Sequence, residues 1–272
     1  MSEWVATGIV WAISLGVAGI LGWILSDIFW QGWHQLNWEF LTTAPRNAGR
    51  EGGIFPLLVS TALILGVCLL VAIPLGLGTA ILLTEFTPVG SRFGEGVRLS
   101  LDILAGAPSI VFGLFGNAFF AKTLGLGFSI LSGGLTLACM VLPIFIRSTQ
   151  EGLRSVPDDY RRVAAALGVS RTAILHAVLL PAAIPGMAVG LLLGIGRALA
   201  ETAALIFTSG YVDRLPTSLL DSGRSLSVHI YDLATNVPGG EVNAYATALV
   251  LVFFLIAINT AVAVIANRLS NK

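Results

Sequence analysis

Long apolar runs separated by short polar stretches dominate the chain. Six runs are each long enough to cross a bilayer as a helix, which takes about 20 mostly apolar residues: Trp4–Phe29, Phe55–Leu83, Leu99–Phe120, Phe128–Ile146, Val178–Thr208 and Ala244–Ala266. Strand-like alternation is absent from these runs, and a backbone in lipid must satisfy its own hydrogen bonds. The pattern therefore predicts an all-α membrane protein with six transmembrane helices in a single domain, residues 1–272.

Composition agrees with this prediction. The chain is 56% hydrophobic and 11% charged, whereas a soluble domain carries about 25% charged residues. Basic and acidic residues balance at 15 each, so nothing indicates nucleic-acid binding. Cys68 and Cys139 lie inside apolar runs and are expected to be core residues rather than a disulfide or a metal site. No basic residue precedes the first run, so we expect a retained helix rather than a signal peptide.

The distribution of basic residues predicts the orientation, because cytoplasmic loops are enriched in Lys and Arg. With both termini cytoplasmic, most basic residues fall inside: Arg92, Arg98, Arg147, Arg154, Arg161, Arg162, Arg171, Arg268 and Lys272. The outer set is smaller: Arg46, Arg50, Lys122, Arg214 and Arg224. We therefore expect both termini inside. The two long outer loops, residues 31–54 and 209–243, are candidates for covering the pore mouth.

The most charged stretch, residues 151–177, does not read as a simple loop, and we call it the coupling segment. Ser155 is expected to cap a short helix that begins near Pro157. Apolar residues recur along this helix at helical spacing: Val156, Tyr160, Val163 and Leu167. Gly168 suits the left-handed conformation that ends a helix, and Ser170 suits the cap of the next one. The sequence predicts two short helices that either dock onto another protein or lie on the membrane surface.

Two charged residues, Arg197 and Glu201, lie inside the fifth run. On a continuous helix this spacing puts them on one face, so we expect an ion pair. A central arginine costs about 2.5 to 3.5 kcal/mol in a membrane, which favours a place in a transport path over a structural pair between helices. Small residues beside it predict close packing of another helix: Gly186, Gly190, Gly194 and Ala198. Asp102, near the start of the third run, is expected either in the path or at the membrane interface.

One further pattern lies in the coupling segment, where Arg161–Gly168 (RRVAAALG) is followed by Val178–Pro181 (VLLP). The pair resembles the EAA motif of ABC importer permeases. The resemblance implies docking onto a separate ATP-hydrolysing subunit through five residues: Val163, Ala164, Ala165, Leu167 and Gly168. Arg162 stands where the motif has glutamate, so we expect docking through shape rather than an acidic contact.

The chain contains no GxxxxGK[ST] phosphate-binding loop. We therefore expect a transport subunit rather than an enzyme. ATP and Mg are expected at the partner ATPase, and no cofactor on this chain.

Segments from Gly52 onward share a second resemblance. The most specific is Gly196–Ala203 (GRALAETA); the others are Gly52–Pro56 (GGIFP), Ala105–Gly116 (AGAPSIVFGLFG), Leu142–Thr149 (LPIFIRST) and Ser227–Tyr231 (SVHIY). They resemble the permeases of phosphate-specific ABC transporters, in particular the PstA-type subunit. The resemblance implies a type I, MetI-like fold with a core at about residues 55–268 and a cytoplasmic coupling helix.

The same resemblance implies a multi-pass protein of the bacterial inner membrane that imports inorganic phosphate. The implied partners are a PstC-type second permease, a PstB-type ATPase dimer and an external PstS-type phosphate-binding protein. Arg197, Glu201 and Arg147 are the residues it implies for the translocation pathway.

Other functions remain open at this stage. An ABC permease for phosphonate, molybdate or sulfate fits the same patterns. An ion-coupled secondary transporter fits less well, because no inverted repeat is visible. An intramembrane enzyme is not supported, because the runs contain no paired aspartates, Ser/His dyad or zinc motif.

Overall fold

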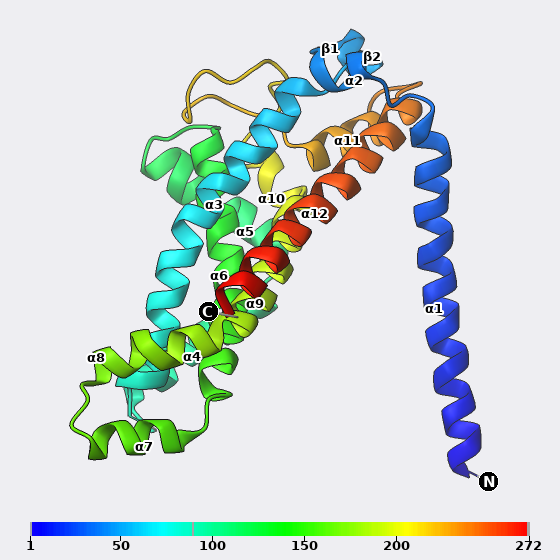
Figure 1. The fold of residues 1–272 in the computed structure, drawn as a ribbon. Coiled ribbons are helices and arrows are strands. Elements are labelled where there is room, and N and C mark those ends of the chain that lie inside the picture. Colours follow the sequence, from blue (N-terminus) through cyan, green and yellow to red (C-terminus); the bar gives the residue numbers. More distant parts are fainter. Residues whose placement is uncertain (1, 89, 271–272) are drawn as a thin grey trace.

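The computed structural model describes residues 2–88 and 90–270, so Met1, Lys272 and two further residues lie outside the description. Five described helices are long and apolar enough to span a membrane (Figure 1). They are or include α1 (Ser2–Trp33), α3 (Phe55–Ile81), α6 (Ile130–Arg154), α9 (Leu180–Ala200) and α12 (Glu241–Ser270). The all-α fold is confirmed, with five of the six predicted runs present as long helices.

The third run departs from the prediction of one span. α4 (Arg92–Gly106) and α5 (Ser109–Gly116) meet at a bend of 106°. Ala107 has an extended backbone and Pro108 precedes the first residue of α5. A proline disfavours helical geometry in the residue before it and lacks the N–H that would continue the ladder. Pro108 lies at this break, so the run counts as a sixth span only as a bent pair.

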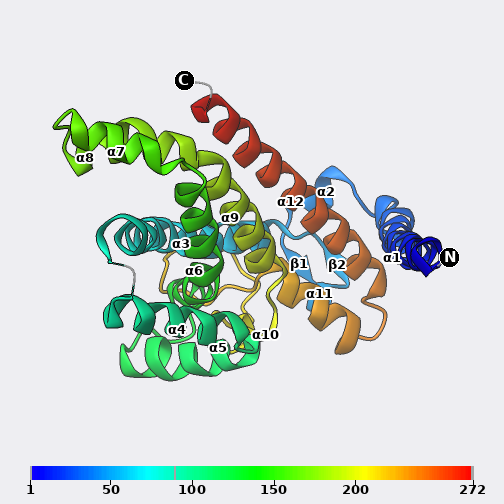
Figure 2. The same ribbon diagram turned by 90° about the horizontal axis from the view of Figure 1, so that it is seen from below.

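The core lies around α6, which packs between α3 and α9 (Figure 2). Its central side chains include Ile64, Leu137, Phe145 and Ile195, all at most 2% exposed. The predicted close packing on α9 is confirmed, and its partner is α6. A Cβ on Gly186 would lie 2.7 Å from the Cα of Gly152 in α6, which leaves no room for a side chain.

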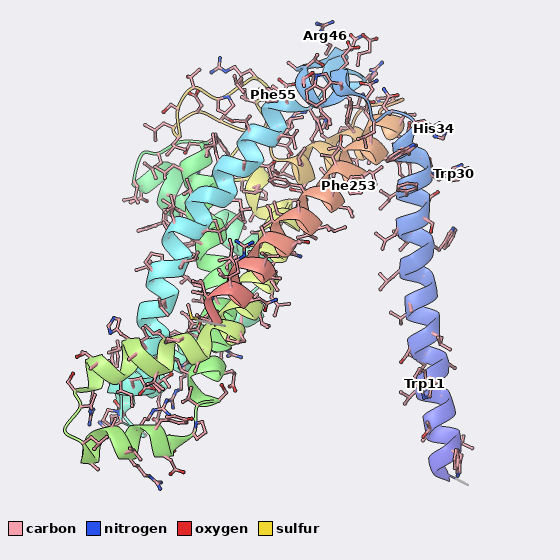
Figure 3. All side chains as sticks on the ribbon, in the orientation of Figure 1. Trp11, Trp30, His34, Arg46, Phe55 and Phe253 are labelled. Atoms are coloured by element: carbon pink, nitrogen blue, oxygen red, sulfur yellow. The ribbon has the colours of Figure 1, made fainter. Side chains whose placement is uncertain are left out.

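α1 stands apart from this core along most of its length (Figure 1). It meets the rest of the chain near its last turn, where Gly32 lies against the backbone of Tyr245 and the side chain of Leu249 on α12. Figure 3 shows the side chains of Trp11 and Trp30 projecting into open space, and both are well exposed. The face of α1 is therefore available to lipid or to another subunit.

One end of the bundle is covered by short elements, which we call the cap. It contains α2 (Trp38–Thr42), β1 (Pro45–Arg46), a 3-10 turn (Asn47–Gly49), β2 (Glu51–Gly52) and α11 (Leu226–Thr235). β1 and β2 pair antiparallel. Two hydrogen bonds tie the cap to the long helices: Asn243 Nδ2 donates to the Gly49 carbonyl at 2.7 Å, and the Leu226 N–H donates to Thr61 Oγ1 at 2.9 Å. Both predicted outer loops lie in the cap.

The coupling segment occupies the opposite end. It contains α7 (Asp158–Ala166) and α8 (Arg171–Ile174), and a π-helical turn (Leu175–Leu179) joins α8 to α9. One capping prediction was wrong: Ser155 ends α6, its hydroxyl donating to the Gly152 carbonyl at 2.8 Å, and Pro157 precedes α7. The reason is that α6 runs through Arg154, beyond the predicted end at Ile146.

Candidate translocation path and coupling segment

The fifth predicted run breaks at Glu201, and this changes the role of its carboxylate. α9 ends at Ala200, and the short α10 (Ala203–Ile206) follows. Glu201 is 8% exposed, and its Oε1 accepts the N–H of Ala204 at 3.0 Å. Its backbone carbonyl accepts the Ser227 hydroxyl of α11 at 2.6 Å. Glu201 therefore fixes the break between α9 and α10 and connects it to the cap.

The expected ion pair between Arg197 and Glu201 is absent from the described residues. A continuous helix was assumed, but the carboxylate turns to the start of α10, which offers unpaired backbone N–H groups. The Arg197 side chain is half-buried and has neither a hydrogen bond nor an ion pair within the described chain. It lies one and two turns beyond Leu193 and Val189, which are 58% and 50% exposed. This face of α9 is only partly covered by the chain itself.

Arg147 lies elsewhere, at the coupling-segment end of α6. It forms an ion pair with Asp102 of α4, and both side chains are about half exposed. The pair lines a cavity of about 270 Å³ that the structure places between α4 and α6. Asp102 was expected in the path or at the interface, and its partner was not foreseen. The structure does not bring Arg147 together with Arg197.

The coupling segment has the predicted helix–glycine–helix form. Gly168 has a φ of +71°, the left-handed region expected of it, and Ser170 Oγ accepts the Ala173 N–H at 3.2 Å. The predicted stripe splits in two. Val156 is 6% exposed and packs under α7, whereas Tyr160, Val163 and Leu167 are 55% to 75% exposed.

The five predicted docking residues divide in the same way. Ala164 is half-buried against the apolar cluster beneath α7, and four remain exposed: Val163, Ala165, Leu167 and Gly168. Val163, Ala164 and Leu167 line an apolar groove of about 490 Å³ between α7 and α8, whereas Ala165 and Gly168 do not. Arg162 is also exposed and approaches only Asp159, at 3.7 Å. The groove is apolar and lies beside the glycine turn.

A partly buried link that sequence reasoning missed holds α7 to the π-helical turn (Leu82–Phe86) that follows α3. Arg161 Nη2 and Nε donate to the two carboxylate oxygens of Glu85 at 2.7 and 3.1 Å. The same guanidinium donates to the carbonyls of Leu153 and Val156, both at 3.0 Å, and to Asp158 at 3.3 Å. The hydrogen bond to Glu85 raises the pKa of Arg161. The available signal was Glu85 itself, an acidic residue directly after a long apolar run.

The cap holds a second buried polar cluster. Arg224 Nη1 lies 3.3 Å from Asp232 Oδ2 and donates to Nδ1 of His229, also at 3.3 Å. His229 is 1% exposed. Burial, with the nearby positive charge of Arg224, lowers its pKa to about 4. The imidazole is therefore neutral and serves the cap as a hydrogen-bond acceptor.

Comparison with known proteins places this architecture. The family model described as "Binding-protein-dependent transport system inner membrane component" matches residues 72–272. The chain belongs to this family. Its fold is that of an ABC importer permease, and the predicted fold class is confirmed.

Several relatives and structures are similar to this chain. A probable ABC transporter permease, YqgI of Bacillus subtilis, is 33% identical to this chain. The alignment covers 96% of this chain and 94% of YqgI. Phosphate transport system permease protein PstA 1 of Mycobacterium tuberculosis is 32% identical over 90% of this chain and 82% of its own length. PstC of Mesorhizobium japonicum is 29% identical, over 90% and 83%.

Among solved structures, a bacterial ABC transporter involved in import of the polysaccharide alginate matches with a TM-score of 0.66 at 14% identity. It covers 98% of this chain and 99% of that one. The inward-facing MetNI methionine transporter matches with a TM-score of 0.60 at 16% identity. The match covers 80% of this chain and 94% of that one. At such identities these two likenesses concern the fold.

Proposed function

We propose that this chain is the membrane-spanning subunit of an ATP-driven importer of inorganic phosphate. The observation that carries the substrate is the similarity to several permeases named for phosphate transport, at 32% identity over most of the chain. The unpaired Arg197 on a partly covered face of α9 supports an anionic cargo, since a guanidinium fork matches a tetrahedral oxyanion. Phosphate is favoured over phosphonate, molybdate or sulfate on the same relatives.

The path in this proposal runs along the partly covered face of α9, against a second permease subunit. Arg197 meets the passing anion there, while Glu201 holds the break that ends α9. Arg147 acts near the coupling segment, where the negative charge of Asp102 balances its positive charge. Similarity to a PstC protein as well as to PstA proteins supports a paired arrangement of related permeases.

The coupling segment docks onto a PstB-type ATPase dimer, which binds ATP and Mg, and a PstS-type protein delivers phosphate from outside. An apolar exposed surface beside a rigid glycine turn suits insertion into a groove of another protein. The coupling segment then faces the cytoplasm and the cap faces outward. Because α1 begins toward the coupling-segment side and α12 returns toward it, both termini are cytoplasmic in this orientation (Figure 1).

Uptake by the reconstituted transporter tests the path. Arg197→Gln should lower phosphate uptake by about tenfold or more, because one charge-assisted hydrogen bond is worth about 1.5 to 3 kcal/mol. The complex should still assemble. Arg268→Gln, at the exposed end of α12, is the matched control and should transport normally. Normal uptake by Arg197→Gln removes this residue from the path.

Co-purification of the ATPase tests the docking. Gly168→Val forces a β-branched residue into a φ of +71° and should release the ATPase from detergent-solubilised complexes. Gly239→Val is the matched control, because Gly239 has a φ of +79° and open space around it, but lies at the cap end. Retention of the ATPase by Gly168→Val argues against docking through this turn.

A further inference from the structure

A basic cavity lies between the coupling segment, the π-helical turn Leu82–Phe86 that follows α3, and the first half of α4. It has a volume of about 640 Å³, and its charged lining residues are Arg98, Arg154, Arg161, Arg171, Glu85 and Asp158. It adjoins the smaller cavity beside Arg147, because Arg98 and Arg154 line both. Positively charged side chains therefore outnumber negatively charged ones in the lining of the larger cavity.

Three of the four lining arginines lack an ion-pair partner, and the four positive charges of the lining exceed its two negative ones. Arg161 takes both carboxylate oxygens of Glu85 and also reaches Asp158. Arg98, Arg154 and Arg171 make no ion pair within 4.0 Å among the described residues. In the smaller cavity Asp102 is taken by Arg147, and Glu151 is exposed. The remaining charge of the larger cavity is positive.

Buried donors without acceptors line the same space. Arg98 Nε and Thr84 Oγ1 are buried and lack a hydrogen-bond partner within the described chain, and both residues line the larger cavity. Gln150 Nε2 is also buried without a hydrogen-bond partner in the described chain, and Gln150 lines the smaller cavity. A buried donor left unsatisfied costs about 1 to 3 kcal/mol. Acceptor oxygens on a ligand would satisfy such donors if their side chains turned toward the cavity.

We propose that this cavity binds a phosphate-type oxyanion, held by the half-buried Arg98 with the exposed Arg154 and Arg171 at the rim. Arginine forks offer paired donors that match the oxygens of a phosphate group. Inorganic phosphate and the headgroup of an anionic lipid share this chemistry. Because α7 forms one wall and the π-helical turn Leu82–Phe86 with α4 forms another, a bound anion bridges the coupling segment and the bundle. The proposed function enters only through the choice of phosphate as a probe.

The test uses the complete transporter in nanodiscs of phosphatidylcholine, without the external binding protein, and measures equilibrium binding of radiolabelled inorganic phosphate. Arg98→Gln combined with Arg154→Gln should weaken binding by about tenfold or more. Arg92→Gln, an exposed arginine of α4 outside both cavities, should not change it. Arg98→Lys combined with Arg154→Lys keeps the charge and should restore part of the affinity if folding is intact. An Arg197→Gln background removes any contribution from the path.

A second arm distinguishes the source of the anion. Nanodiscs that contain phosphatidylglycerol are analysed by native mass spectrometry for lipid retained by the complex. Phosphate binding in phosphatidylcholine that depends on Arg98 and Arg154 supports free phosphate as the ligand. Retained phosphatidylglycerol that the double variant loses, without phosphate binding, supports a lipid headgroup. If the double variant changes neither measurement, the cavity holds water and the inference is overturned. Phosphate uptake by the unaltered transporter is measured separately. If this transporter binds phosphate in the cavity but does not import it, only the proposed function is contradicted.

Discussion

α1 and α6 are both long apolar helices, but their environments are opposite. Both are long, apolar and rich in glycine. Two-thirds of the most apolar stretch of α6 is buried in the molecule, and none of that of α1 is. Added Cβ atoms on Gly133, Gly134 and Gly152 of α6 would collide with neighbouring elements, whereas those on Gly16 and Gly19 of α1 would meet nothing. Hydropathy thus assigns both helices to the membrane but does not decide which one forms the core.

The same contrast recurs for charged and titratable residues. Arg161 is held by five hydrogen bonds, and its neighbour Arg162 is exposed. His229 is buried in the cap, and His34 is exposed at the end of α1. Substituting the same residue type at a buried and at an exposed position therefore measures what burial contributes to stability.

The largest expected effect comes from glycine. Gly186→Val places a side chain against the backbone of Gly152, within 2.7 to 3.0 Å, and should destabilise the protein by about 3 kcal/mol or more. Gly16→Val in α1 should change stability by less than about 0.5 kcal/mol. Thermal unfolding in detergent, followed by size-exclusion chromatography, compares the two. Equal stabilities would contradict the assignment of α6 as the packed core.

The next effect depends on pH and compares the histidines. The unfolded His229 protonates below its ordinary pKa of 6.5, whereas the folded one stays neutral to about 4. Stability is therefore lost as the pH falls from about 6.5 to about 4, by up to about 3 kcal/mol. His229→Gln keeps an acceptor for Arg224 and should flatten this dependence, measured as melting temperature against pH. If His34→Gln flattens it instead, the buried histidine is not the titrating group.

The smallest effect compares the adjacent arginines. Arg161→Gln leaves Glu85, whose side chain is 12% exposed, without its partner and should loosen α7 by about 1 to 2 kcal/mol. Arg162→Gln should have an effect near zero, because its pair with Asp159 is exposed. Hydrogen exchange of α7 amides reports the difference. Comparable exchange in both variants would show that Glu85 does not anchor the coupling segment.

Much of the site could be predicted because local chemistry controls it. The left-handed Gly168 and the Ser170 cap follow from the backbone demands of a helix–turn–helix. The pairing of Arg197 with Glu201 was wrong because spacing implies proximity only on a continuous helix, and the chain breaks at Glu201. The partners of Arg161 and Arg147 were missed for a related reason, since Glu85 and Asp102 lie far away in sequence.

The sequence by itself determined that this is a multi-pass helical membrane protein with a helix–glycine–helix coupling segment. The physical reason is that lipid and local backbone geometry act on each segment separately. The tertiary structure alone decided which helix is central, that the chain folds back at Pro108, and where each buried charge finds a partner. These outcomes depend on which segments meet in space, and direct contact is what satisfies a buried polar group.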